Sequence, residues 1–230
     1  MTISAYEIDR IRQLPMFSGI STSRFGEILG SAALRVFFKR TTVFEQGDPV
    51  RNFYVVLSGW VKLSRMRPDG TEVVMEIFGP GESFAEGAMH MGEGYPATAQ
   101  MIEDGRLLAI PTSAIRQQMA EDSDLALSML SAMAVRLKRF ARRIERINSQ
   151  SAPQRVAEFL LKFSAPPVPG EQSTNVTLPY DKQLIANRLG MKPETFSRAL
   201  GALKKQGVEI DGVSASIADV AGLRRFVTPE

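Results

Sequence analysis

Apolar and polar positions change their period along the chain, and these changes divide it into regions. Residues 4–31 show short helical patterns that break before Pro15, with Ser21 or Ser23 as the cap of a helix. From Arg35 onward, β-branched and aromatic residues form short runs, which are separated by the turn-forming segments EQGDP, RPDG and FGPGE. Several short strands at this spacing predict a sandwich or roll of about 80 residues.

The period becomes helical at Asp124 and continues to Ser149 without a break residue. Apolar residues in this stretch recur at intervals of three and four, at Leu130, Met133, Leu137, Phe140, Ile144 and Ile147. This is the a/d pattern of a two-stranded coiled coil, so we predict that these six residues, called the seam below, form a dimer interface. The alternative is one long helix that packs on its own domain. Basic residues are predicted to flank the seam, at Arg136, Lys138, Arg139, Arg142, Arg143 and Arg146.

The segment that follows begins with Ser151, Ala152 and Pro153, which end the long helix and form a candidate hinge. A helix is expected over residues 154–164 and a proline-rich loop over residues 165–174.

Two further helices are predicted close together after this loop. The first covers Asp181–Leu189, and Gly190 allows a tight turn. The second starts at Pro193, which suits the first helical position, and ends near Gln206 with Gly207 as its stop. Two helices joined by a short turn that contains glycine indicate a helix-turn-helix. The next segment, VEIDGVSASI, predicts a two-stranded wing.

The second of these helices has two distinct faces. Its apolar residues are expected to pack inward, namely Phe196, Ala199, Leu200 and Leu203. Glu194, Ser197 and Arg198 are spaced i, i+3 and i+4, so they share the other face near the start of the helix, the part of a recognition helix that reaches base edges. Arginine donates to guanine, glutamate accepts from cytosine, and serine bonds to a base or a phosphate. The alternative is a surface helix with an ordinary Glu194–Arg198 ion pair.

Cations around this motif are suited to phosphate contacts, which supply salt-dependent affinity for DNA. The candidates are Lys182, Arg188, Lys192, Lys204 and Lys205.

The formal charge is +3 and is unevenly distributed. Residues 1–122 carry 12 Lys+Arg and 15 Asp+Glu (−3), residues 123–150 carry 6 and 2 (+4), and residues 151–230 carry 10 and 8 (+2). A basic rear half is consistent with an anionic partner, although a solvated basic helix would give the same balance.

Other classes of protein are disfavoured by composition. There is no cysteine and a single histidine, His90, which excludes disulfides, iron–sulfur clusters and the usual zinc or copper sites from this chain alone. A β-roll enzyme of the cupin type would need several histidine ligands, so we expect no enzyme. No apolar run approaches the ~20 residues of a membrane span, and the start lacks a signal-peptide pattern, so a cytoplasmic protein is expected.

The whole layout resembles the cyclic-AMP receptor protein/FNR (CRP/FNR) family of bacterial transcription regulators. FEQGDPVRNFYVVLSGWVKL is similar to the β-roll of that family, and PETFSR matches the FNR-type E-x-x-S-R pattern. The resemblance implies an α+β fold: a cyclic-nucleotide-binding-like β-roll (residues 1–122), a dimerisation helix (123–150) and a winged helix-turn-helix (151–230). It also implies a homodimer that binds double-stranded DNA at inverted repeats of TTGAT or TTGAC and regulates transcription, as activator or sometimes repressor, through RNA polymerase.

In cyclic-nucleotide binders of this family, an Arg-Ser pair that binds the phosphate follows a Gly-Glu segment. Here Glu86 falls at the ribose-binding glutamate, but Pro96 and Ala97 stand where Arg and Ser would be. A cyclic phosphate would lack its charge-assisted partners there, so cyclic AMP or GMP is not expected. We expect Glu86 to accept hydrogen bonds from backbone N–H groups instead.

SFAEGAMHMGEGYPATAQ is most similar to the Dnr/Nnr-type regulators of denitrification, a resemblance that implies a haem pocket and a response to nitric oxide. His90 is then the candidate axial ligand, and the alternative is a partly exposed loop histidine. The effector site is predicted around Glu86, Met89, His90, Met91, Pro96 and Ala97. A constitutively active regulator without an effector is the competing interpretation of the whole chain.

Overall fold

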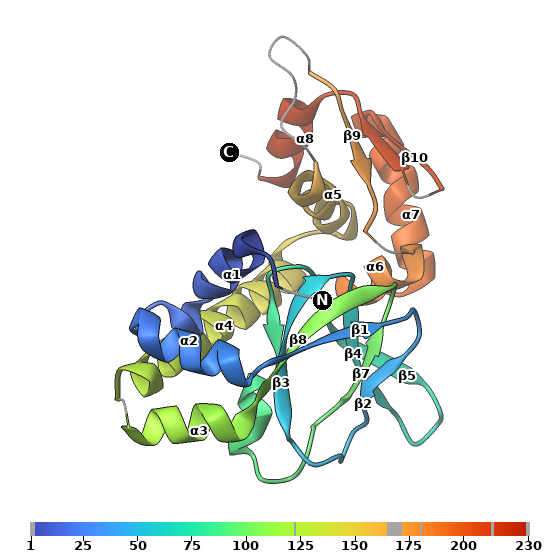
Figure 1. Ribbon diagram of the computed structural model, residues 1–230. Coiled ribbons are helices and arrows are strands. Elements are labelled where there is room, and N and C mark those ends of the chain that lie inside the picture. The colour runs from blue at the N-terminus through green and yellow to red at the C-terminus, as the bar shows by residue number, and fades with distance from the viewer. Residues whose placement is uncertain (1–2, 122, 165–171, 180, 213, 229–230) are drawn as a thin grey trace. The chain divides into compact units, whose positions relative to one another are not determined.

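The computed structural model describes residues 3–121, 123–164, 172–179, 181–212 and 214–228, apart from the side chains of His90, Arg143 and Arg146. The chain divides into two compact units, Met1–Arg139 and Phe140–Glu230, and each is described by itself (Figure 1). Most of the proline-rich loop predicted at residues 165–174 lies outside the described residues. No helix of the described ranges is long and apolar enough to span a membrane.

Helices frame the start and the end of the first unit. They are α1 (Ala5–Arg12), η1 (Pro15–Phe17), α2 (Thr22–Ser31), η2 (Glu86–His90), α3 (Thr112–Glu121) and the first part of α4 (Ser123–Ser149). Ser4 and Glu7 form a capping box at the start of α1. Of the two caps considered for α2, Ser21 is the one used, because its side chain accepts from the Arg24 N–H at 3.3 Å. Helix α3 was not predicted from the sequence.

The strands of the first unit are β1 (Ala33–Phe37), β2 (Thr42–Phe44), β3 (Asn52–Ser58), β4 (Val61–Met66), β5 (Glu72–Phe78), β6 (Ser83–Phe84), β7 (Thr98–Met101) and β8 (Gly105–Pro111). They form two antiparallel four-stranded sheets, with strand orders β1-β8-β3-β6 and β2-β7-β4-β5. The β-roll predicted from the strand spacing is confirmed.

Strands β3 and β8 are buried on both faces. On β3, Tyr54 and Val56 belong to the core between the two sheets, whereas Phe53 and Val55 face a second core shared with the helices. On β8, Leu107 and Ala109 face the first core, and Leu108 and Ile110 the second. Burial on both faces explains the continuous apolar runs FYVVL and LLAI, which differ from the alternation of a half-exposed strand.

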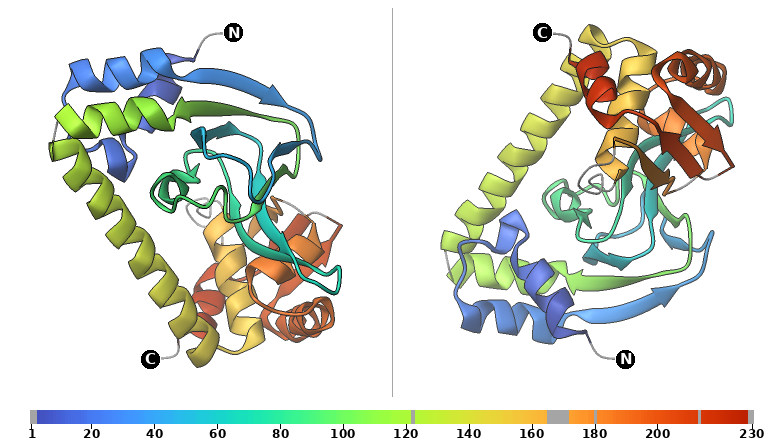
Figure 2. Two further views of the ribbon diagram at one scale, coloured as in Figure 1. Left: turned by 90° about the horizontal axis from the view of Figure 1, so that it is seen from below. Right: turned by 90° about the horizontal axis from the view of Figure 1, so that it is seen from above.

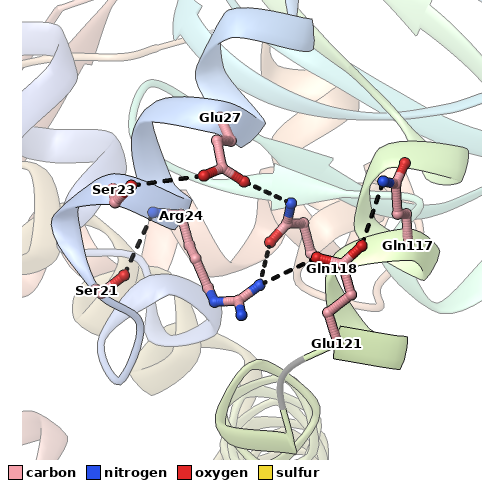
Figure 3. A network of polar contacts seen from close by, with 7 residues as sticks. All are labelled: Ser21, Ser23, Arg24, Glu27, Gln117, Gln118 and Glu121. Atoms are coloured by element: carbon pink, nitrogen blue, oxygen red, sulfur yellow. Dashed lines mark hydrogen bonds and ion pairs between the residues drawn. The ribbon is translucent and has the colours of Figure 1, made fainter.

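Helices α2 and α3 lie side by side and are joined by a polar network (Figures 2 and 3). Arg24 donates to the side-chain oxygen of Gln118 at 2.7 Å, and the Gln118 amide donates to Glu27 at 2.8 Å. Arg24 also pairs with Glu121 at 3.6 Å. This network holds α3 in place just before α4 begins.

The long helix α4 changes character along its length. Leu125 and Met129 are buried in the helix-side core, whereas Leu130, Leu137 and Ile144 are 64%, 69% and 61% exposed. The first turns of α4 therefore contribute to the hydrophobic core, whereas most of the large apolar residues that follow are exposed.

The second unit contains α5 (Ala152–Phe163), β9 (Thr174–Thr177), α6 (Lys182–Arg188), α7 (Pro193–Leu203), η3 (Lys204–Gln206), β10 (Val208–Asp211), β11 (Ser214–Ile217) and α8 (Val220–Val227). Strands β10 and β11 form the predicted hairpin, and β9 adds a third strand in the order β10-β11-β9. The winged helix-turn-helix is confirmed, whereas β9 and α8 were not foreseen.

Candidate DNA interface and sensor site

Local capping sets the start of each helix in the helix-turn-helix. The side chain of Asp181 accepts from the Leu184 N–H at 2.9 Å and begins α6. Gly190 has a φ of 65° and makes the turn, a conformation that favours glycine. Pro193 occupies the start of α7, where its missing N–H costs no helical hydrogen bond.

Helix α7 separates its side chains as the sequence predicts. Phe196, Ala199 and Leu203 are buried, and Leu200 is half-buried. Glu194, Ser197 and Arg198 are all exposed on the first turns of the helix (α7 in Figure 1). The buried face fixes the helix on its domain, so the three polar side chains form a surface that can meet the edges of base pairs.

The cations proposed for phosphate contacts surround this helix. Lys182, Lys192, Lys204 and Lys205 are exposed, whereas Arg188 is half-buried. Helix α7 continues into η3 and ends at Gly207, whose φ is 72°.

The hairpin β10–β11 carries charge of the opposite sign, because Glu209 and Asp211 are exposed on β10. DNA contacts from these two positions would be repulsive, so the candidate phosphate contacts stay with the cations of α6, the N-cap of α7 and η3.

The segment with Pro96 and Ala97 is anchored by its neighbour Tyr95. The Tyr95 ring stacks on Phe44 with centroids 3.6 Å apart, and its hydroxyl donates to the Asn52 carbonyl at 2.5 Å. Burial raises the pKa of Tyr95 above its ordinary value, so this hydroxyl stays protonated and keeps its role as donor.

A cation does lie beside this segment, although the segment itself contains none. The Nε of Arg65, on β4, donates to the Pro96 carbonyl at 2.5 Å. The sequence argument against a cyclic phosphate considered only the residues at positions 96 and 97. It missed Arg65 because this residue lies 31 positions earlier in the chain.

The candidate sensor residues do not all come together. Met89 is buried in the helix-side core, whereas Met91 is 58% exposed. The backbone of His90 ends η2, but its side chain lies outside the described part of the structure. Among the described residues, no group of three or more His, Cys, Asp or Glu could hold a metal ion.

Glu86 has a different partner from the one expected. Its Oε1 accepts from Nη1 of Arg136 at 2.7 Å, and the same guanidinium reaches Glu76 at 3.2 Å through Nη2. The prediction that Glu86 accepts from backbone N–H groups is therefore wrong. Arg136 does not simply flank the seam either, because its side chain turns toward the β-roll. Sequence spacing could not show this, since the two carboxylates lie 60 and 50 residues away from Arg136.

Comparison with known proteins agrees with this architecture. Residues 34–122 match the family model of the cyclic nucleotide-binding domain, and residues 154–226 match that of the Crp-like helix-turn-helix domain. The CRP-like cAMP-activated global transcriptional regulator of Mycobacterium tuberculosis is 27% identical over 212 residues, which cover 91% of this chain and 95% of that regulator.

Two solved structures are similar over nearly the whole chain. DNR from Pseudomonas aeruginosa is 33% identical with a TM-score of 0.58, and the match covers 98% of this chain and 100% of DNR. A protein from Ruegeria pomeroyi is 33% identical with a TM-score of 0.74 and coverage of 99% and 100%. The matched regulators are not enzymes, in agreement with the expectation from the sequence. This chain belongs to the CRP/FNR family of DNA-binding transcription regulators.

Proposed function

We propose that the chain acts as a homodimer that binds an inverted repeat of TTGAT or TTGAC and regulates transcription through RNA polymerase. Glu194, Ser197 and Arg198 contact base edges, and the surrounding lysines with Arg188 contact phosphates. The observation that carries the proposal is the exposure of these three polar side chains on α7, whose opposite face is buried.

Dimerisation through the seam of α4 supports the same proposal. The seam residues listed above follow one another at coiled-coil spacing, and five of the six are among the exposed large apolar residues of the chain. Two copies joined there would present two α7 helices to half-sites about one helical turn apart, near 34 Å. The domain boundaries at residues 122 and 150 are part of this proposal.

The test is a mobility-shift titration with a TTGAT-N4-ATCAA duplex and a scrambled duplex of the same composition. We expect the wild type to bind the palindrome at least about 1000-fold more tightly, as specific regulators do. Equal affinity for both duplexes would overturn the assigned sequence preference. The same titration with one half-site scrambled shows whether two copies bind together.

Control by an effector in the β-roll is the second part of the proposal. Haem with a response to nitric oxide is the candidate that the family resemblance suggests, and the side chain of its candidate ligand, His90, lies outside the described part of the structure. Met89 is inside the core and Met91 points to solvent. An absorption spectrum during haem titration, with His90→Ala beside the wild type, decides this point. A Soret band that saturates and is lost in the variant would identify a haem protein.

A constitutive regulator is the alternative, and one contact favours it. The carboxylate at the ribose-binding position is already engaged by Arg136, a residue of the chain itself. DNA affinity that is unchanged by haem, nitric oxide and cyclic AMP would support this alternative. Cyclic AMP belongs in the series because Arg65 places a cation beside Pro96.

A further inference from the structure

Three charged side chains from distant parts of the first unit meet at one place. Arg136 comes from the middle of α4, Glu76 from β5 and Glu86 from the start of η2. The guanidinium uses one nitrogen for each carboxylate, at 3.2 Å and 2.7 Å. It also lies over the ring of Phe78, 5.3 Å from the centroid. A single side chain therefore links the long helix to two elements of the β-roll.

The three side chains are largely removed from water. Arg136 and Glu76 are each 30% exposed, and Glu86 is 12% exposed. Burial opposes the charge of Arg136, but the attraction of Glu86 and Glu76 and the hydrogen bonds to both outweigh it, so the pKa of the guanidinium is raised. The two carboxylates thus favour the charged form of a group that is protonated at every physiological pH.

The cluster is not fully satisfied. Two carboxylates face one guanidinium, and the second oxygen of Glu86, Oε2, is buried without a hydrogen-bond partner among the described residues. A part-buried ion pair adds little net stability but fixes geometry, and the loss of one partner leaves an uncompensated charge behind. An incompletely satisfied cluster of this kind is sensitive to any group that competes for Glu86.

The backbone at this place is also unusual. Ala85, directly before Glu86, has a φ of 67°, which costs a residue with a Cβ atom about 1 kcal/mol or more. Such strain persists only where the surrounding structure holds it, and the pair between Glu86 and Arg136 is one such constraint.

Arg136 stands at a boundary on α4. Before it, Leu125 and Met129 are buried in the helix-side core, and Ala132 and Met133 are half-buried. After Arg136, every side chain of α4 that the structure describes is exposed, including the second half of the seam. The two ion pairs therefore hold α4 on the β-roll at the point where its side chains become exposed.

We propose that Arg136 is a latch, which holds α4 on the β-roll through Glu76 and Glu86 and thereby sets the affinity of the distant α7 helices for DNA. This inference rests on the proposed function, because it assumes that α4 joins two copies. Opening of the latch changes the position or dynamics of α4 where the seam begins, and the arrangement of the two α7 helices follows. Arg136 acts as a positioning residue that does not touch DNA.

The experiment compares Arg136→Gln, Glu86→Gln and the double variant in the mobility-shift titration with the palindromic duplex. We expect each single change to alter the Kd at least fivefold. The double variant should differ from either single variant by less than twofold, because both changes break the same interaction. Arg136→Lys keeps the charge but cannot bind both carboxylates with a planar guanidinium. Its Kd should therefore lie between that of the wild type and that of Arg136→Gln.

The matched control is Arg139→Gln, which removes the same charge from an exposed position of the same helix. Its effect on the Kd should stay below twofold. Hydrogen exchange checks the mechanism, since the latch variants but not the control should exchange faster in η2 and in residues 130–139. Thermal unfolding and sedimentation establish that each variant is folded and whether it is a dimer.

The outcomes separate the latch from the proposed function. If the wild type binds the duplex and Arg136→Gln behaves like Arg139→Gln, the latch is refuted and the DNA assignment stands. If the wild type fails to bind while both latch variants bind, the latch and the DNA assignment are both supported. If none of the proteins binds any duplex, both are refuted.

Discussion

The exposed faces of α7 and of the second half of α4 differ in kind. Helix α7 presents Glu194, Ser197 and Arg198, polar side chains that water solvates well. Helix α4 presents apolar side chains such as Leu137 and Ile144, which are 69% and 61% exposed. A continuous apolar stripe in water is unfavourable and indicates a protein partner. An exposed polar face is stable in water by itself, so its partner has to be argued from the residue types it presents. The proposed function therefore assigns two kinds of recognition to the same helical geometry.

The largest effect should come from a charge in the apolar stripe. Leu137→Glu should convert the dimer into monomers and weaken binding to the palindromic duplex by at least about 100-fold, since the two half-sites no longer reinforce each other. Sedimentation equilibrium and the mobility-shift titration measure both effects.

Val135→Glu is the control for this change. Val135 is 44% exposed on α4 and lies outside the seam spacing. The Val135→Glu substitution should therefore leave the dimer intact. A Leu137→Glu protein that dimerises like Val135→Glu would exclude the seam as the interface.

A change on the polar face should have a smaller effect that depends on sequence. Arg198→Ala should cost about 1–3 kcal/mol of binding free energy on the TTGAT duplex and relax the preference at one base position of each half-site. Titrations against duplexes with single base changes measure this. An equal loss on specific and scrambled DNA would show that Arg198 contacts only the backbone.

Loss of a phosphate contact should be smaller again and independent of sequence. Lys204→Ala should weaken binding to all duplexes about equally and reduce the slope of log K against log salt by about 1 per protomer. The acidic hairpin supplies an internal comparison. Glu209→Gln should strengthen binding to DNA slightly if β10 approaches the phosphates. A salt slope that is the same in Lys204→Ala and in the wild type would place Lys204 away from DNA.

The smallest effect concerns stability at the sensor side. Ala85 has a φ of 67°, so Ala85→Gly should raise the free energy of unfolding by up to about 1 kcal/mol through the relief of strain. Chemical denaturation at constant pH measures this. The comparison variant is Ala132→Gly, in the interior of α4, which should lower the free energy of unfolding by about 1 kcal/mol. A loss of stability in both variants would show that the strain at Ala85 is negligible.

The sequence located features whose determinants lie close together in the chain. The turn at Gly190 and the start of α7 at Pro193 were predicted, and Ser21 was one of two candidate caps, because each depends on a few neighbouring residues. Asp181 was expected as the first residue of α6 and is its N-cap. Element α3 had no such signal, and β9 and α8 were also missed. Strand β9 has only four residues and is defined by its pairing with β11.

The sensor side shows where prediction from sequence fails. Arg136 was placed beside the seam by its spacing, yet its side chain pairs with Glu76 and Glu86. Arg65 was not considered at all, yet it lies against the Pro96 carbonyl. Both residues come from elements far away in the chain, and nothing in a local pattern records which strand is brought next to which helix.

The sequence by itself determined the helix-turn-helix, the β-roll and the polar face of α7, because periodicity, caps and turns act over a few residues. Only the tertiary structure decided which charges meet at Glu86, which methionines enter the core and where the side chains of α4 become exposed. These are long-range contacts, and their energies depend on burial and distance, which arise only when the elements are packed together.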